Sequence, residues 1–110
     1  MHRVLNLQSI GKDATVISNH KSEIQVIRDR FIDDLHSSQV NDGTNEDGNP
    51  TLGVGMDFNN ATQGNAFHEE LKQYIRDNSG DFSFARTRVH DCNHAADKNE
   101  PCKIGDMWKL

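Results

Sequence analysis

The sequence predicts an α+β fold, an antiparallel sheet of about four or five strands with two helices packed on one face. Residues 52–58 alternate apolar side chains with Gly or Asp, which is typical of a strand with one buried face. Residues 24–35 and 65–78 instead place apolar side chains at helical spacing. A ferredoxin-like sandwich is one form that this combination of elements can take.

The length of 110 residues predicts a single domain spanning residues 1–110. Only 34% of the residues are hydrophobic, so we expect a small core in which one crosslink matters. The longest apolar runs are a few residues, far short of the ~20 that a membrane-spanning helix needs. We therefore expect no membrane span.

The first third of the chain predicts two strands and a helix. Residues 3–10 and 14–18 are expected to be short strands around a turn at residues 11–13. Ser22, followed three positions later by Gln25, forms a capping box and predicts a helix start there. This helix is expected to fade near residues 37–38, with an apolar stripe of Ile24, Ile27, Phe31 and Leu35.

Residues 41–50 predict a loop because turn-forming residues dominate the segment. In the strand at 52–58 that follows, Gly53 and Gly55 leave one face nearly bare. Either another chain segment approaches closely there, or the glycines form a floor under a ligand. The other face of this strand is expected to pack on the helices through Leu52, Val54, Met56 and Phe58.

The second helix is expected over residues 65–78, with Gly80 ending it. Its apolar stripe is Phe67, Leu71, Tyr74 and Ile75. Residues 82–90 predict a strand on which Phe82 and Phe84 share a face with three basic or titratable residues, Arg86, Arg88 and His90. A closing strand is expected over residues 104–109.

Cys92 and Cys102 are the two cysteines of the chain, and His90 and His94 lie beside the first of them. Both cysteines occur in polar sequence, which favours a disulfide that closes a short loop between the last two strands. Free thiols and a zinc site formed by the four side chains are the alternatives. Zinc sites usually use wider ligand spacings, so we expect no metal and no cofactor.

The net charge of −5 argues against a nucleic-acid binder that works by neutralising phosphates. Arg86, Arg88, His90 and His94 concentrate positive or titratable groups in this acidic chain. Because arginine suits contact with acidic groups, these residues predict a binding site for a protein partner whose identity the sequence does not give.

The alternative interpretation is that the same strand forms part of an enzyme active site. In a small ribonuclease or phosphodiesterase, His90 would act as acid or base and Arg86 and Arg88 would hold the phosphate. Glu69 or Glu70 would be the partner of the histidine. A third alternative is an intracellular regulatory binding domain with reduced cysteines.

The tail from His90 to Gly105, which includes His-Asp-Cys-Asn-His and Pro-Cys-Lys, resembles the ends of small secreted fungal proteins. These are effectors and killer-toxin-like proteins with compact αβ sandwich folds. The resemblance implies a secreted or host-delivered protein that acts by binding, and it transfers no catalytic residue. A cytoplasmic location is expected instead if the cysteines are reduced.

Overall fold

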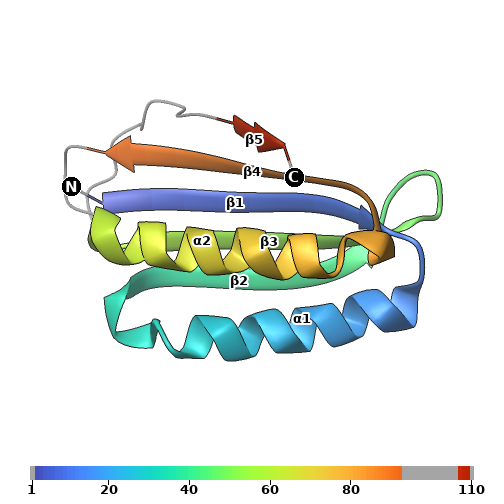
Figure 1. The fold of residues 1–110 in the computed structure, drawn as a ribbon, viewed down its shortest axis with the longest axis horizontal. Helices are drawn as coiled ribbons and strands as arrows, with labels where there is room; N and C mark the ends of the chain where they lie inside the picture. Colours follow the sequence, from blue (N-terminus) through green and yellow to red (C-terminus); the bar gives the residue numbers. More distant parts are fainter. Residues whose placement is uncertain (1, 93–106, 110) are drawn as a thin grey trace.

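The computed structural model describes residues 2–92 and 107–109, in which two helices cover one face of an antiparallel sheet. Figure 1 shows both helices on the same side of the sheet. In the described residues the sheet has five strands in the order β2-β3-β1-β4-β5. In chain order the elements are β1 (His2–Gly11), α1 (Ala14–Asp29), β2 (Leu35–Thr44), β3 (Pro50–Phe58), α2 (Ala61–Asp77), β4 (Phe82–Cys92) and β5 (Met107–Lys109), with short 3-10 turns η1 (Ile32–Asp34) and η2 (Ser79–Asp81).

The α+β class with helices on one face is confirmed. The order of the first six elements, β-α-β-β-α-β, is the one that a ferredoxin-like sandwich requires, so the finer expectation is compatible with the structure. β1 lies inside the sheet and pairs antiparallel with β3 on one side and β4 on the other. β5 pairs antiparallel with β4, which confirms the closing strand at residues 107–109.

The core lies between the sheet and the two helices. Phe31, Phe58 and Phe67 form its aromatic centre, with ring centroids 5.5 Å apart for Phe31–Phe67 and 5.4 Å for Phe58–Phe67. Every predicted core residue belongs to it, either buried or packed against it. The buried cluster also contains residues that we did not predict, namely Leu5, Leu7, Ile17, Val40, Phe82 and Ala85.

The predicted strand at 14–18 is wrong, because these residues begin α1. The Asp13 side chain accepts hydrogen bonds from the backbone N–H groups of Thr15 and Val16, at 2.9 and 3.0 Å, and so caps the helix. The β-branched residues at 15–17 suggested a strand, but burial of Ile17 against the sheet outweighs that weak preference. The capping box at Ser22 is therefore also wrong, since Ser22 lies inside the helix.

The predicted end of this helix is wrong as well. α1 ends at Asp29, and residues 35–44 form β2, an edge strand paired with β3. Val40 is the one buried residue of β2 among polar neighbours, so the strand lacks the apolar alternation by which strands are recognised. The loop expected at 41–50 is accordingly shorter and occupies residues 45–49.

The expected strand at 82–90 is confirmed, but Phe82 does not share a face with Phe84. The pairing of β1 with β4 shifts between Ile10 and Gly11, so that Ile10 pairs with Phe84 and Gly11 with Phe82. This irregularity puts Phe82 on the helix side, where it is 8% exposed. Phe84, Arg86, Arg88 and His90 keep the predicted common face.

Candidate binding face of the sheet

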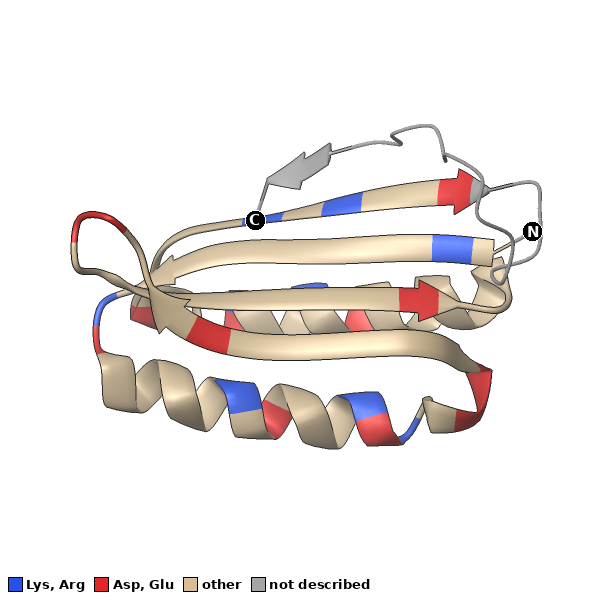
Figure 2. Cartoon of the chain, turned by 180° about the vertical axis from the view of Figure 1, so that it is seen from behind, with Lys and Arg blue, Asp and Glu red and all other residues tan. Residues whose placement is uncertain are grey.

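The face of the sheet that points away from both helices is the candidate binding site, and we call it the open face. Alternation along the strands assigns its residues, because Leu5, Leu7 and Thr87 are buried against the helices and their neighbours point the other way. Figure 2 views the molecule from this side and shows the basic positions along β4. The open face includes His2, Val4, Asn6, Gln8 and Ile10 of β1, Thr51, Gly53, Gly55 and Asp57 of β3, and Phe84, Arg86, Arg88 and His90 of β4.

Arg86 is held against its neighbours on the open face. Its Nε donates to Oε1 of Gln8 at 2.7 Å, and a second guanidinium nitrogen donates to the same oxygen. The guanidinium carbon lies 5.8 Å from the centroid of the Phe84 ring, within the range of a cation–π contact. Arg86 therefore has a fixed position, and it fixes the orientation of the Gln8 amide.

Arg88 differs from Arg86 in that its Nε is shielded from solvent and has no hydrogen-bond acceptor among the described residues. It lies directly opposite Asn6 of β1. A buried donor without an acceptor costs roughly 1–3 kcal/mol. An oxygen of a bound partner would remove that cost once the side chain turned to expose Nε.

The structure brings together three of the four predicted binding residues. His90 follows Arg86 and Arg88 on the open face and pairs with Val4 of β1. His94 and Cys102 lie outside the described residues, and only the backbone of Cys92 is described, at the end of β4 opposite His2. The disulfide and zinc alternatives consequently remain predictions. Within residues 2–92 and 107–109, no group of three or more His, Cys, Asp or Glu could hold a metal ion.

Two hollows lie on the open face, and a glycine of β3 lines each of them. One has a volume of about 330 Å³ beside Gly53, Gln8 and Phe84, and the other about 360 Å³ beside Gly55 and Asn6. A Cβ added at Gly53 would come no closer than 3.9 Å to another atom, the Leu7 carbonyl oxygen. Packing within the described chain thus does not require glycine there, which favours the ligand-floor interpretation of Gly53.

The carboxylates of the enzyme alternative do not join the basic residues. Glu69 and Glu70 lie on α2, in the layer on the opposite side of the sheet from Arg86, Arg88 and His90. Glu69 lies 2.7 Å from Nζ of Lys72, which holds its pKa below the usual range, and Glu70 pairs with Arg30 at 2.6 Å. The ribonuclease-like constellation is therefore not assembled.

Two histidines on the helix side, His20 and His68, are buried, which the sequence did not lead us to predict. His20 joins α1 to α2 and to η2, with Nδ1 2.5 Å from the Tyr74 hydroxyl and Nε2 2.8 Å from Oδ2 of Asp81. His68 of α2 lies with Nε2 2.9 Å from Oγ1 of Thr87. His20 continues the helical spacing of Ile17 and Ile24, so that pattern could have indicated its burial.

No family model and no curated protein matches the chain. Among solved structures, a de novo designed protein, Foldit4, is similar with a TM-score of 0.72 at 10% identity, over 84% of this chain and all of that one. A phage SAM lyase in complex with S-methyl-5'-thioadenosine is similar with a TM-score of 0.50 at 12% identity, over 99% of this chain and 88% of that one. At such identities these similarities show the fold alone.

Proposed function

We propose that this chain acts by binding an acidic protein partner through the open face, with Arg88 as the anchor. The observation that carries the proposal is the solvent-shielded Nε of Arg88, which has no acceptor among the described residues. Once the guanidinium turns outward, a partner carboxylate would accept that hydrogen bond, and charge-assisted bonds of this kind are stronger than neutral ones. A donor that has no acceptor among the described residues would thereby contribute to affinity.

A protein partner fits this site better than a nucleic acid. The chain has a net charge of −5, which repels a long run of phosphates, whereas a few carboxylates can contact β4 locally. Arginine binds a carboxylate through its planar donor fork. Because such pairing mainly sets the rate and orientation of encounter, binding is expected to weaken as salt is added.

We further propose that this binding takes place outside the cell, as in the secreted effector and toxin-like proteins whose ends the tail resembles. The support is the sequence of residues 90–105 and the expected oxidation of Cys92 and Cys102. In the described residues, no helix is long and apolar enough to cross a membrane.

The direct test is a titration of the ¹⁵N-labelled protein with a peptide of alternating Asp and Glu. The Nε–H resonance of Arg88 should shift as the carboxylates bind. Arg88→Glu, alone or with Arg86→Glu, should abolish the shifts of the open face. Arg88→Lys should weaken binding by at least about tenfold, because it keeps the charge and loses the Nε–H donor.

Arg76→Glu is the matched control, since this exposed arginine lies on α2 in the other layer and the reversal changes the net charge equally. It should leave peptide binding close to that of the wild type. If the folded Arg88→Glu protein binds as well as Arg76→Glu does, Arg88 is not the anchor and the proposal fails.

A further inference from the structure

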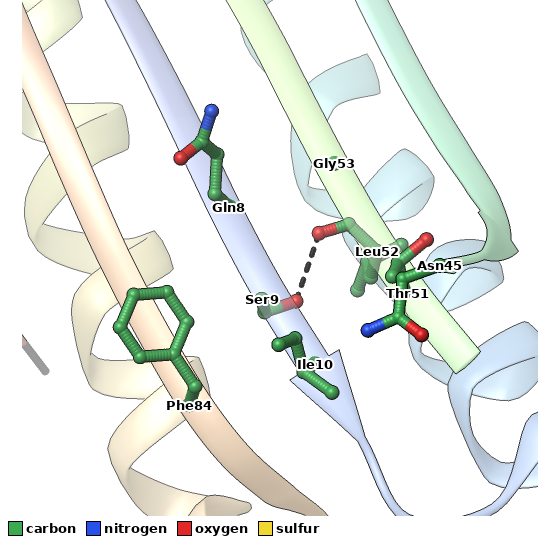
Figure 3. A pocket seen from close by; sticks show the side chains of 8 residues that line it. All are labelled: Gln8, Ser9, Ile10, Asn45, Thr51, Leu52, Gly53 and Phe84. Carbon is green, nitrogen blue, oxygen red and sulfur yellow. Dashed lines mark hydrogen bonds between the residues drawn. The ribbon is translucent and has the colours of Figure 1, made fainter. Parts of the chain in front are cut away.

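We infer that the hollow beside Gly53 is a binding site for a small planar heterocycle with carbonyl oxygens on its edge, the chemistry of a uracil-type base. Figure 3 shows the hollow at one end of the open face, with Phe84 on one side and Thr51 and Asn45 on the other. Its volume of about 330 Å³ is at the lower end of the range of small-molecule sites. This site is separate from the anion contact proposed at Arg88.

One amide side chain beside the hollow, that of Asn45, presents a hydrogen-bond donor to it. Oδ1 of Asn45 accepts from the backbone N–H groups of Asp47 and Asn49, at 3.0 and 2.9 Å. Oε1 of Gln8 accepts from Arg86 at 2.7 Å. Since Oδ1 of Asn45 is engaged, its Nδ2 group remains to donate, and Figure 3 shows this nitrogen on the side facing Ile10, whereas the Gln8 nitrogen points away from the hollow. A ligand that fits must therefore supply acceptors.

The apolar part of the hollow suits a flat ring. Phe84 offers an aromatic surface, and contact between an aromatic side chain and a base is favourable for any base. Gly53 places no side chain on the floor of the hollow. The space above it is open, since an added Cβ would meet nothing closer than 3.9 Å. Beneath the floor, Oγ of Ser9 donates to the Leu52 carbonyl at 2.8 Å and ties β1 to β3. The site is consequently held in shape before a ligand arrives.

The experiment is an NMR titration of the labelled protein with uridine, followed at residues 8, 53 and 84. 5,6-Dihydrouridine has the same carbonyl groups and lacks the aromatic ring, so it should bind roughly tenfold more weakly. Gly53→Val should abolish binding by filling the hollow, whereas Gly55→Val fills the neighbouring hollow and should leave uridine binding unchanged. Gly53→Ala serves in its place if Gly53→Val does not fold.

An isosteric variant tests the donor. Asn45→Asp keeps the oxygen that accepts from the turn and replaces the donating amide by an acceptor. It should weaken uridine binding several-fold while the turn resonances stay in place. Gln8→Glu is the matched control, because the Gln8 nitrogen points away from the hollow, and it should bind uridine as the wild type does. Wild-type affinity in Asn45→Asp would overturn the assignment of the donor.

Three further results would overturn the inference. They are an absence of shifts at residues 8, 53 and 84 with uridine, equal binding of dihydrouridine, and unchanged binding in folded Gly53→Val or Gly53→Ala. Tighter binding of a short oligouridylate than of uridine would overturn the assignment to a free small molecule. Arg88→Glu should not alter uridine binding, so failure of the acidic-partner proposal and failure of this one are distinguishable.

Discussion

At the residue scale, His68 shows how the core decides the protonation of a side chain. His68 is 3% exposed beneath α2, and Nε2 lies 2.9 Å from the hydroxyl of Thr87, which is fully buried. Burial, with a smaller repulsion from Lys72, lowers the pKa of His68 to about 4. The unfolded chain has a value of about 6.5. The fold therefore prefers the neutral imidazole.

This difference predicts a pH dependence of stability. A histidine whose folded pKa is depressed contributes stability that is fully present above the unfolded pKa of about 6.5. The contribution is lost as pH falls from there towards 4, by up to about 3 kcal/mol in total. Urea unfolding at steps between pH 7 and pH 4 should show this loss in the free energy of unfolding.

His68→Gln is the matched variant, because glutamine can hydrogen-bond to Thr87 and does not titrate. It should be less stable at pH 7 and should lose less stability on acidification than the wild type. If the two proteins lose equal stability between pH 7 and pH 4, His68 is not buried as the neutral form.

At the element scale, α2 is attached to the sheet by apolar contacts along one stripe. Leu71 is fully buried in the middle of this helix, between Phe67 and Ile75. Leu71→Ala should lower the free energy of unfolding by ~2–5 kcal/mol, because it removes buried methyl groups and leaves a cavity. Chemical denaturation measures this loss directly.

Val26→Ala on α1 is the control for this prediction, since Val26 is 65% exposed. It should change stability by no more than about 0.5 kcal/mol. A Leu71→Ala protein as stable as Val26→Ala would mean that α2 does not pack through Leu71.

At the scale of the whole molecule, the sequence predicts those elements in which buried apolar residues recur at the spacing of a strand or a helix. β3 alternates cleanly and α2 has an uninterrupted stripe, and both elements were predicted, although α2 begins at Ala61, capped by Asn60, and not at residue 65. β2 was not predicted because an edge strand with Val40 as its buried residue needs no apolar alternation. The start of α1 was not predicted because the β-branched residues that follow its cap, Asp13, are typical of a strand.

The candidate site was predictable to a similar extent. Alternation correctly placed Arg86, Arg88 and His90 on one face, because that property depends on the local backbone. The environment of Arg88, whose Nε has no acceptor among the described residues, and the hydrogen bond of Gln8 depend on β1 lying beside β4, about eighty positions away in the chain. Such contacts follow from strand order, which periodicity alone does not determine.

The final prediction concerns the connection between the last two strands. We expect Cys92 and Cys102 to form an intramolecular disulfide. Cys92 ends β4, and β5 returns antiparallel from Met107, so the bridge would close the chain at the outer side of the sheet. Closing a loop of this size should stabilise the fold by up to ~3 kcal/mol in the chain-entropy model. That is a large share of the stability of a small domain.

Replacing both cysteines with serine should lower the melting temperature by on the order of 10 °C. The intact mass of the wild type should rise by two hydrogens on reduction, and reductant should lower its melting temperature while leaving that of the serine variant unchanged. Thiol titration of the native protein should find no reactive group. Two reactive thiols in the native protein would contradict the disulfide, and they would favour the intracellular alternative over the secreted one because reduced cysteines are typical of the cytosol.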